Sequence, residues 1–200
     1  MISLPLRLGF LASRNGTAMR AIVNAARGRA LDADPRLVVS NNRNAAALAY
    51  AEAHGLPTLC VPTQSDPQAA DERLCEALEA AGVELVVLSG YLRQLGPKTL
   101  HRFHNRILNI HPGPLPAFGG QGMYGRRVHE AVIAAGAAAS EICIHLVDEE
   151  YDRGPVLARR SVPLQPGETA ESLEGRILAL EPPFFVETLR AIAEGACALP

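Results

Sequence analysis

The stretch that decides the fold is Leu108-Asn109-Ile110-His111-Pro112-Gly113-Pro114-Leu115-Pro116. The apolar residues around Asn109 are typical of a strand, and Pro112 and Pro114 end it because proline cannot donate to a sheet. In an extended strand, residues two apart point to the same face, so Asn109 and His111 are expected to project together. The stretch therefore predicts a strand that presents an amide and an imidazole at its C-terminal end.

Short apolar runs alternate with helix-like patterns on either side of this strand. Strands are predicted at residues 8–12, 37–40, 59–61, 85–88, 107–109, 142–147 and 156–162. Helices are predicted at residues 17–26, 45–54, 67–81, 124–135 and 168–194, the last interrupted near Pro182-Pro183. The alternation predicts an α/β fold, with a Rossmann-like, mostly parallel twisted sheet and helices on both faces. Only a loop separates the last two strands, which favours antiparallel strands at the C-terminal edge.

Length and composition limit the class of protein. The 200 residues fit one domain, and the apolar content of 48% is ample for a core. A net charge of −2 gives no reason to expect nucleic acid or an anionic membrane as partner. No apolar run reaches the roughly 18 residues that span a bilayer, and the first residues lack the pattern of a secretory signal, so none is expected. The four cysteines are scattered without a Cys-x-x-Cys pair, which is typical of reduced thiols in a cytoplasmic protein.

A second candidate for the site is Asp152-Arg153-Gly154-Pro155, which follows the strand predicted at residues 142–147. Asp152 stands before a glycine turn that could place it against His111. An amide and an imidazole at a sheet edge can hold an oxyanion, and a carboxylate beside the imidazole tunes its charge. The set suits acyl transfer without a serine or cysteine nucleophile. From the residues alone, a purely turn-shaping role for Asp152 is an equal alternative.

The turn after the first strand, Ala12-Ser13-Arg14-Asn15-Gly16-Thr17-Ala18-Met19, is a candidate phosphate site. A small, glycine-containing turn that leads into a helix presents free backbone N–H groups and the positive end of the helix dipole. A plain strand–helix turn capped by Asn15 or Thr17 is about equally expected.

Three further motifs carry weaker signals. The segment Ser40-Asn41-Asn42 is typical of an Asx-turn. The loop at residues 90–96 follows a strand end, where open α/β sheets bind ligands, but its leucines could equally pack under the next helix. His101 and His104 lack nearby carboxylates or thiols in the sequence, so no metal site is expected. His129 and His145, taken alone, are interpreted as satisfied polar residues.

Together these motifs resemble those of the folate-dependent formyltransferase family, over nearly the whole chain. The matching segments are Ser13–Thr17, Ser40-Asn41, Gly90-Tyr91-Leu92-Arg93, Asn109-Ile110-His111-Pro112 with Leu115-Pro116, Asp152-x-Gly154-Pro155, and Glu181. Three departures all fall on the amine-substrate side. Ala18 stands where asparagine is usual, the glycine-rich segment at residues 118–125 looks longer, and Pro182-Pro183 stand where a histidine is common.

The resemblance implies a role for each matching residue. It makes Asn109, His111 and Asp152 the catalytic trio. The residues implied to line the folate's pterin pocket are Leu92, Arg93, Leu95, Val147, Asp148 and Asp152. The residues implied to bind the amine substrate are Asn15, Gly16 and Thr17, which hold its phosphate, and Glu181, which holds ribose hydroxyls. Residues 1–105 would then form the phosphate and amine-substrate half, and residues 106–200 the catalytic and folate-binding half.

The resemblance further implies formyl transfer from 10-formyltetrahydrofolate, a co-substrate, to a primary amine, with no metal. Glycinamide ribonucleotide, in de novo purine biosynthesis, is the expected acceptor. The alternatives are another amine such as an amino sugar, water in a formyl-folate hydrolase, or a non-catalytic folate-binding protein. In this hypothesis a protonated His111 and the Asn109 amide stabilise the oxyanion, and Asp152 keeps His111 charged. The partners are small molecules, and the sequence leaves the oligomeric state open, a homodimer included.

Overall fold

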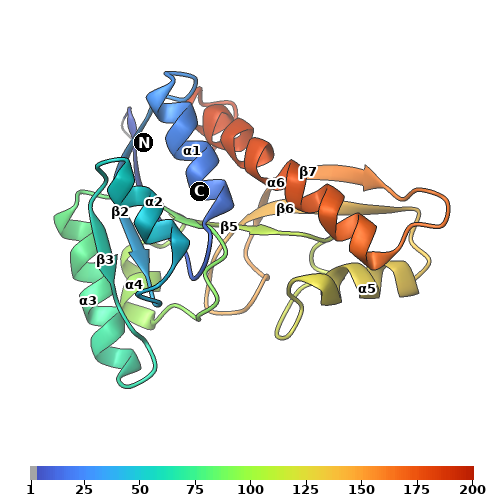
Figure 1. Cartoon of the computed structure of the whole chain (residues 1–200), viewed down its shortest axis with the longest axis horizontal. Helices are drawn as coiled ribbons and strands as arrows, with labels where there is room; N and C mark the ends of the chain where they lie inside the picture. The colour runs from blue at the N-terminus through green and yellow to red at the C-terminus, as the bar shows by residue number, and fades with distance from the viewer. Residues whose placement is uncertain (1–3) are drawn as a thin grey trace.

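The computed structural model describes residues 4–200 and contains one seven-stranded sheet, in the order β3-β2-β1-β4-β5-β6-β7 (Figure 1). The strands are β1 (Leu6–Leu11), β2 (Ala33–Ser40), β3 (Thr58–Cys60), β4 (Leu85–Leu88), β5 (Ile107–His111), β6 (Ala139–Leu146) and β7 (Val156–Pro163). Strands β1 to β5 pair in parallel, whereas β6 runs antiparallel to both β5 and β7. The predicted parallel sheet with antiparallel strands at its C-terminal edge is confirmed.

Helices cover both faces of this sheet, as predicted. They are α1 (Thr17–Arg27), α2 (Ala46–Ala53), α3 (Pro67–Ala80), α4 (Pro97–Arg102), α5 (Arg126–Ala134) and α6 (Ala170–Ala193). Side chains of β1 alternate between the faces: Leu8 and Phe10 pack with α1 and α6, and Leu11 packs with α3. Gly9 also faces α3, where an added Cβ would lie 2.8 Å from Leu78. The strands are therefore buried on both sides, which is typical of parallel sheets.

Helix α6 corrects one prediction, because it runs without interruption through Pro182 and Pro183. Each proline removes a backbone N–H, which normally kinks or ends a helix. Here Ile177 before the prolines and Phe185 after them are both fully buried against the same core. Burial on both sides of the prolines outweighs the lost hydrogen bonds.

Helix α4 was not predicted, because six residues are too few to show a helical period. It begins at Pro97, whose fixed φ suits a first helical turn. The buried carboxylate of Asp71, on α3, accepts from the backbone N–H groups of Lys98, at 2.8 Å, and Thr99, at 3.1 Å. A side chain distant in sequence therefore caps this helix.

The sheet order places β1 between β2 and β4. Strands β2 and β3 extend the sheet on one side of β1, and the chain then crosses to the other side to form β4 and β5, so the strand order reverses at β1. Open α/β sheets bind ligands at such a point, beyond the carboxyl ends of the strands. The loops after β1 and β4 are tied together there. The N–H of Ser13 donates to the carbonyl of Gly90 at 3.1 Å, and the N–H of Leu92 donates to Ser13 Oγ at 2.8 Å.

Within residues 4–200, no helix is long and apolar enough to cross a membrane.

Candidate active site

Strand β5 carries both Asn109 and His111, as the i, i+2 pattern predicts. The strand is two residues longer than expected and ends immediately before Pro112. His111 is buried, with 3% of its surface exposed, and Asn109 is half-buried. The amide and the imidazole therefore lie inside the molecule rather than on its surface.

Both ring nitrogens of His111 have partners. Nε2 lies 2.8 Å from the carbonyl oxygen of Phe118, and Nδ1 lies 3.5 Å from Asp152 Oδ2. A carbonyl only accepts hydrogen bonds, so Nε2 carries the proton. The same carboxylate oxygen of Asp152 accepts from the N–H of Gly120 at 3.1 Å. The structure thus brings Asp152 to His111 and sets the loop at residues 118–120 against both.

His145 joins this group, although its sequence surroundings gave no sign of it. It lies on β6, directly opposite Asn109 in the antiparallel pair. Its Nε2 is 3.1 Å from Asn109 Nδ2 and 3.4 Å from Asp152 Oδ1, and its Nδ1 donates to the carbonyl of Leu146 at 2.9 Å. His145 therefore connects the amide to the carboxylate. The register of β5 against β6 is the signal that finds it, and the local sequence does not contain that register.

The resting charge of His111 corrects the expectation of a stable imidazolium. Burial lowers the pKa of His111 below its usual value, more strongly than the Asp152 carboxylate and the Phe118 carbonyl raise it. Burial also raises the pKa of Asp152, but the His145 and His111 rings and the Gly120 N–H together leave that pKa below its ordinary value. The site at neutral pH is thus a carboxylate facing a mostly neutral imidazole.

The turn that delivers Asp152 has a demanding backbone. Asp152 itself is left-handed, with φ of 57°. An added Cβ at Gly154 would lie 1.9 Å from the carbonyl oxygen of Leu146, so only glycine fits there. A Cβ at Gly119 would lie 2.9 Å from the Cβ of Asp152. Asp152 therefore shapes the turn and also faces the imidazoles. The turn-shaping role and the position against His111 do not exclude each other.

The candidate phosphate turn has free donors but no side-chain cap. Helix α1 begins after Gly16, which has φ of 62°, so the expected cap by Asn15 or Thr17 is wrong. A left-handed N-cap position suits glycine because it has no Cβ. The N–H of Met19 donates to Ser89 Oγ at 3.0 Å. Among the described residues, the N–H groups of Thr17 and Ala18 have no hydrogen-bond partner, so they remain open to an anion.

Glu181 lies on α6, the helix that packs against α1. It is half-buried, and burial raises its pKa to about 7. The described part of the chain offers it no hydrogen-bond or ion-pair partner. A carboxylate in this position is suited to accept hydroxyl hydrogen bonds from a ligand.

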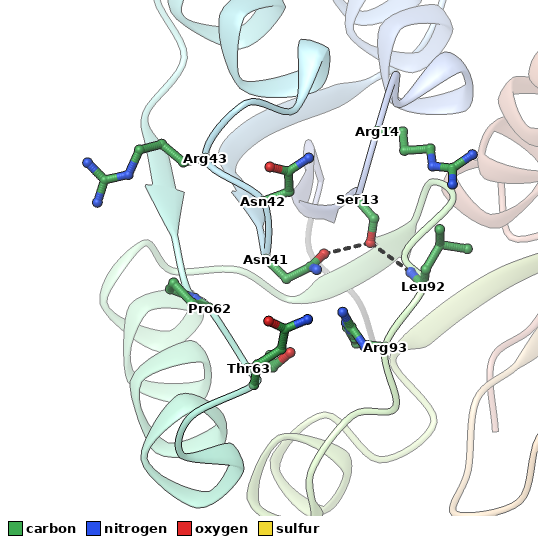
Figure 2. A pocket seen from close by; sticks show the side chains of 10 residues that line it. Ser13, Arg14, Asn41, Asn42, Arg43, Pro62, Thr63, Leu92 and Arg93 are labelled. Carbon is green, nitrogen blue, oxygen red and sulfur yellow. Dashed lines mark hydrogen bonds between the residues drawn. The ribbon is translucent and has the colours of Figure 1, made fainter.

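The expected folate residues fall into separate surroundings. Leu92 and Arg93 line a cavity of about 500 Å³ beside Ser13 (Figure 2). Val147 and Asp148 line another cavity, of about 440 Å³, together with His101, His104 and two glutamates. Leu95 is buried in the core under α3. The structure therefore does not gather this set into one pocket. No cluster of His, Cys, Asp or Glu in the described chain could hold a metal ion.

Known proteins resemble this chain in both sequence and structure. The sequence model of the formyl transferase family matches residues 6–189. The chain belongs to the formyl transferase family. The crystal structure of glycinamide ribonucleotide transformylase 1 from Symbiobacterium toebii matches with a TM-score of 0.85 and 34% identity, over 95% of this chain and 88% of that one.

Relatives by sequence include the phosphoribosylglycinamide formyltransferase of Mycobacterium tuberculosis. It is 37% identical over 194 residues, which cover 96% of this chain and 86% of that protein. The chloroplastic phosphoribosylglycinamide formyltransferase of Vigna unguiculata is 38% identical over 190 residues, or 94% of this chain. The chain spans between 61% and 65% of the length of three such plant relatives.

Proposed function

We propose that this protein transfers a formyl group from 10-formyltetrahydrofolate to the primary amine of glycinamide ribonucleotide. The observation that carries the proposal is the connected set of Asn109, His145, Asp152 and His111, in which two imidazoles face a half-buried carboxylate and one of them also contacts an amide. Two relatives of this chain, from Mycobacterium tuberculosis and Vigna unguiculata, are named phosphoribosylglycinamide formyltransferases. The same proposal includes a role in purine biosynthesis and a cytoplasmic location.

In the proposed reaction, the amine nitrogen adds to the formyl carbon, and the bond from that carbon to N10 of the folate breaks. The amine loses one proton and N10 gains one, so the products are a formamide and tetrahydrofolate. His111 keeps its proton on Nε2, which donates to the oxyanion in place of the Phe118 carbonyl. Preorganised donors of this kind are worth about 3 kcal/mol each.

Asp152 and Nδ1 of His111 hold the proton that leaves the amine. Nδ1 is the ring nitrogen without a proton at rest, and it faces Asp152 Oδ2 at 3.5 Å. The imidazolium that forms would be stabilised by the carboxylate. His145 acts as a positioning residue, because its Nε2 lies beside both the Asn109 amide and the Asp152 carboxylate, while its Nδ1 is held by the Leu146 carbonyl.

The substrates are proposed to occupy opposite sides of this set. The free N–H groups at the start of α1 support phosphate binding in residues 1–105, together with Asn15, Gly16 and Thr17, while Glu181 would meet the ribose. Catalysis belongs to residues 106–200. The folate would contact both parts, because Leu92 and Arg93 precede residue 105 whereas Val147 and Asp148 follow it. Continuity of one sheet through both parts supports a single domain over residues 1–200.

An acceptor screen tests the proposal. The protein is mixed with 10-formyltetrahydrofolate and either glycinamide ribonucleotide, its dephosphorylated ribonucleoside, an amino sugar, or no amine, and tetrahydrofolate is followed by absorbance. We expect turnover with the ribonucleotide and a much lower kcat/KM for the ribonucleoside. Equal kcat/KM for these two would refute the phosphate site, and release without an amine would indicate a hydrolase. His111→Ala should lower turnover by on the order of 10²-fold, whereas Arg73→Ala, at an exposed position on α3, should leave it unchanged.

A further inference from the structure

Three side chains lie in register across strands β5, β6 and β7, which are neighbours at the C-terminal edge of the sheet (Figure 1). His111 stands directly opposite Cys143 in the β5–β6 pair, and Cys143 stands directly opposite Arg159 in the β6–β7 pair. Directly opposed residues of neighbouring strands project from the same face of a sheet. Arg159 therefore rises from the same face as His111, two strand spacings or about 10 Å away.

The guanidinium of Arg159 holds the chain that follows β5. Its Nη2 donates to the backbone carbonyl of Leu115 at 3.0 Å, and its Nη1 donates to Glu141 Oε2 at 2.8 Å. Nη1 also lies 3.6 Å from the sulfur of Cys143, so the side chain lies over the middle residue of the row. One side chain thus connects β6 and β7 to a residue that lies four positions after His111.

The chain at residues 114–119, here called the 114–119 turn, is closed by its own hydrogen bonds. The N–H of Phe118 donates to the carbonyl of Pro114 at 2.9 Å, and the N–H of Gly119 donates to the carbonyl of Pro116 at 3.4 Å. Leu115 is buried against this turn, since a Cβ added at Gly119 would lie 2.3 Å from Leu115 Cδ2. The turn is therefore a compact unit, and its place is fixed where Leu115 is held.

Two backbone groups at the end of the 114–119 turn contact the catalytic residues. The carbonyl of Phe118 accepts from His111 Nε2 at 2.8 Å, and the N–H of Gly120 donates to Asp152 Oδ2 at 3.1 Å. A displacement of the turn would change both contacts, and with them the direction of the His111 N–H. A misplacement of about 1 Å at a reacting group can cost about 10²-fold in rate.

We propose that Arg159 is a positioning residue for formyl transfer, which holds the 114–119 turn where its end meets the catalytic residues. The inference rests on the proposed function. The side chains of Arg159 and Glu141 are 44% and 30% exposed, so their ion pair by itself contributes little to stability. Arginine suits the role because its planar fork binds a carboxylate with one nitrogen and a carbonyl with another, which a single ammonium group does not do in a fixed geometry.

The next residue along β7 provides a matched control. Arg160 projects from the opposite face of the strand, where it pairs with Glu187 and lies over the Phe184 ring of α6. Arg160→Gln and Arg159→Gln each remove one positive charge and one ion pair from the same strand. Only Arg159→Gln also removes the contact with the 114–119 turn.

The first measurement is steady-state turnover of 10-formyltetrahydrofolate and glycinamide ribonucleotide. In Arg159→Gln, kcat should fall about five- to thirtyfold, with the KM of each substrate within about twofold of wild type, because the change acts through the catalytic residues. Arg159→Lys keeps the charge but loses the fork, so its kcat should remain at least about fivefold low. Glu141→Gln, a milder change that keeps Arg159, should lower kcat about two- to fivefold. Arg160→Gln should keep kcat within about twofold.

The second measurement is NMR of isotope-labelled histidine, which needs no substrate. The His111 Nε2–H should give a signal protected from exchange with water in the wild type and in Arg160→Gln, because the Phe118 carbonyl accepts it. In Arg159→Gln this signal should broaden or disappear, while the thermal unfolding midpoint matches that of Arg160→Gln. A merely structural role would lower the midpoint and leave the signal in place.

Three outcomes would overturn the inference. The first is normal kcat in Arg159→Gln, which leaves the proposed function intact. The second is full recovery of kcat in Arg159→Lys, which would assign the effect to charge rather than to the held turn. The third is an unchanged His111 Nε2–H signal in Arg159→Gln. If the wild type transfers no formyl group to any amine, the proposed function fails, and the NMR comparison alone decides whether Arg159 positions the turn.

Discussion

Replacing Asp152 with asparagine tests the electrostatic centre of the site. The change keeps the size of the side chain and can keep the hydrogen bond from the Gly120 N–H, but it removes the negative charge. Asp152 Oδ2 lies 3.5 Å from Nδ1 of His111, and 11% of the Asp152 side chain is exposed. The charge therefore acts on the imidazole at short range and with little water around it.

The size of the effect follows from that distance. Two unit charges 3.5 Å apart attract by roughly 5 kcal/mol at an effective dielectric constant of about 20, which is an upper bound for this pair. If about half of this attraction develops as the His111 ring takes up a proton, the barrier rises by about 2–3 kcal/mol. Since about 1.4 kcal/mol corresponds to tenfold in rate, turnover should fall on the order of 10²-fold.

The pKa of His111 gives a readout that a merely structural role would not change. Burial already holds this pKa below the usual value, and Asp152 opposes the shift, so Asp152→Asn should lower the pKa further. NMR titration of His111 measures this directly. Where neutral His111 limits the rate, the acid limb of kcat/KM should also move to lower pH. An unchanged His111 pKa would refute the reasoning. Glu130→Gln, an exposed charge change on α5, is the matched control.

Three further predictions have separate expected outcomes. Asn109→Ala and His111→Ala should each lower turnover by on the order of 10²-fold with unchanged circular dichroism, and near-normal turnover in either would contradict its role. Gly154→Ala should destabilise the fold by about 1–3 kcal/mol through its clash with a backbone carbonyl, whereas Gly175→Ala, on open helix surface, should stabilise it by about 0.5–1 kcal/mol in urea melts. Glu181 has a folded-state pKa of about 7 against an ordinary 4.5, so the free energy of unfolding falls as pH rises between those values. The free energy of unfolding of Glu181→Gln should therefore exceed that of the wild type by up to about 3 kcal/mol at pH 8 and equal it at pH 4. A difference that does not depend on pH would contradict the buried carboxyl.

Local sequence patterns predicted the elements whose signal lies within one segment. Strand β4 begins and ends where its apolar run does, and β5 presents Asn109 and His111 as the two-residue period requires. Helix α4 was missed because its N-terminal cap comes from Asp71, which lies 26 residues before Pro97. The break expected in α6 was wrong. The low helix propensity of the two prolines is a local property, whereas the burial of apolar side chains on both sides of them, which keeps the helix continuous, depends on the packed core.

The same distinction applies to the site. Asp152-x-Gly154-Pro155 is recognisable in sequence because the close approach at Gly154 requires glycine. His145 was not recognisable, because its role comes from its position opposite Asn109 in an antiparallel pair. The charge of His111 was mistaken for a similar reason: the neighbouring carboxylate can be read from the motif, but the burial that lowers the pKa depends on the whole fold.

The resting hydrogen bonds also change the interpretation of the glycine-rich loop. From sequence, residues 118–125 belong to the amine-substrate side, yet Phe118 accepts from His111 and Gly120 donates to Asp152. The Nε2–H of His111 thus has a protein acceptor before any substrate arrives, which avoids an unpaired donor in a buried site. Formyl transfer would require the oxyanion to replace that carbonyl. Changes in this loop are therefore expected to alter kcat as well as the choice of amine, because the same residues contact the catalytic pair.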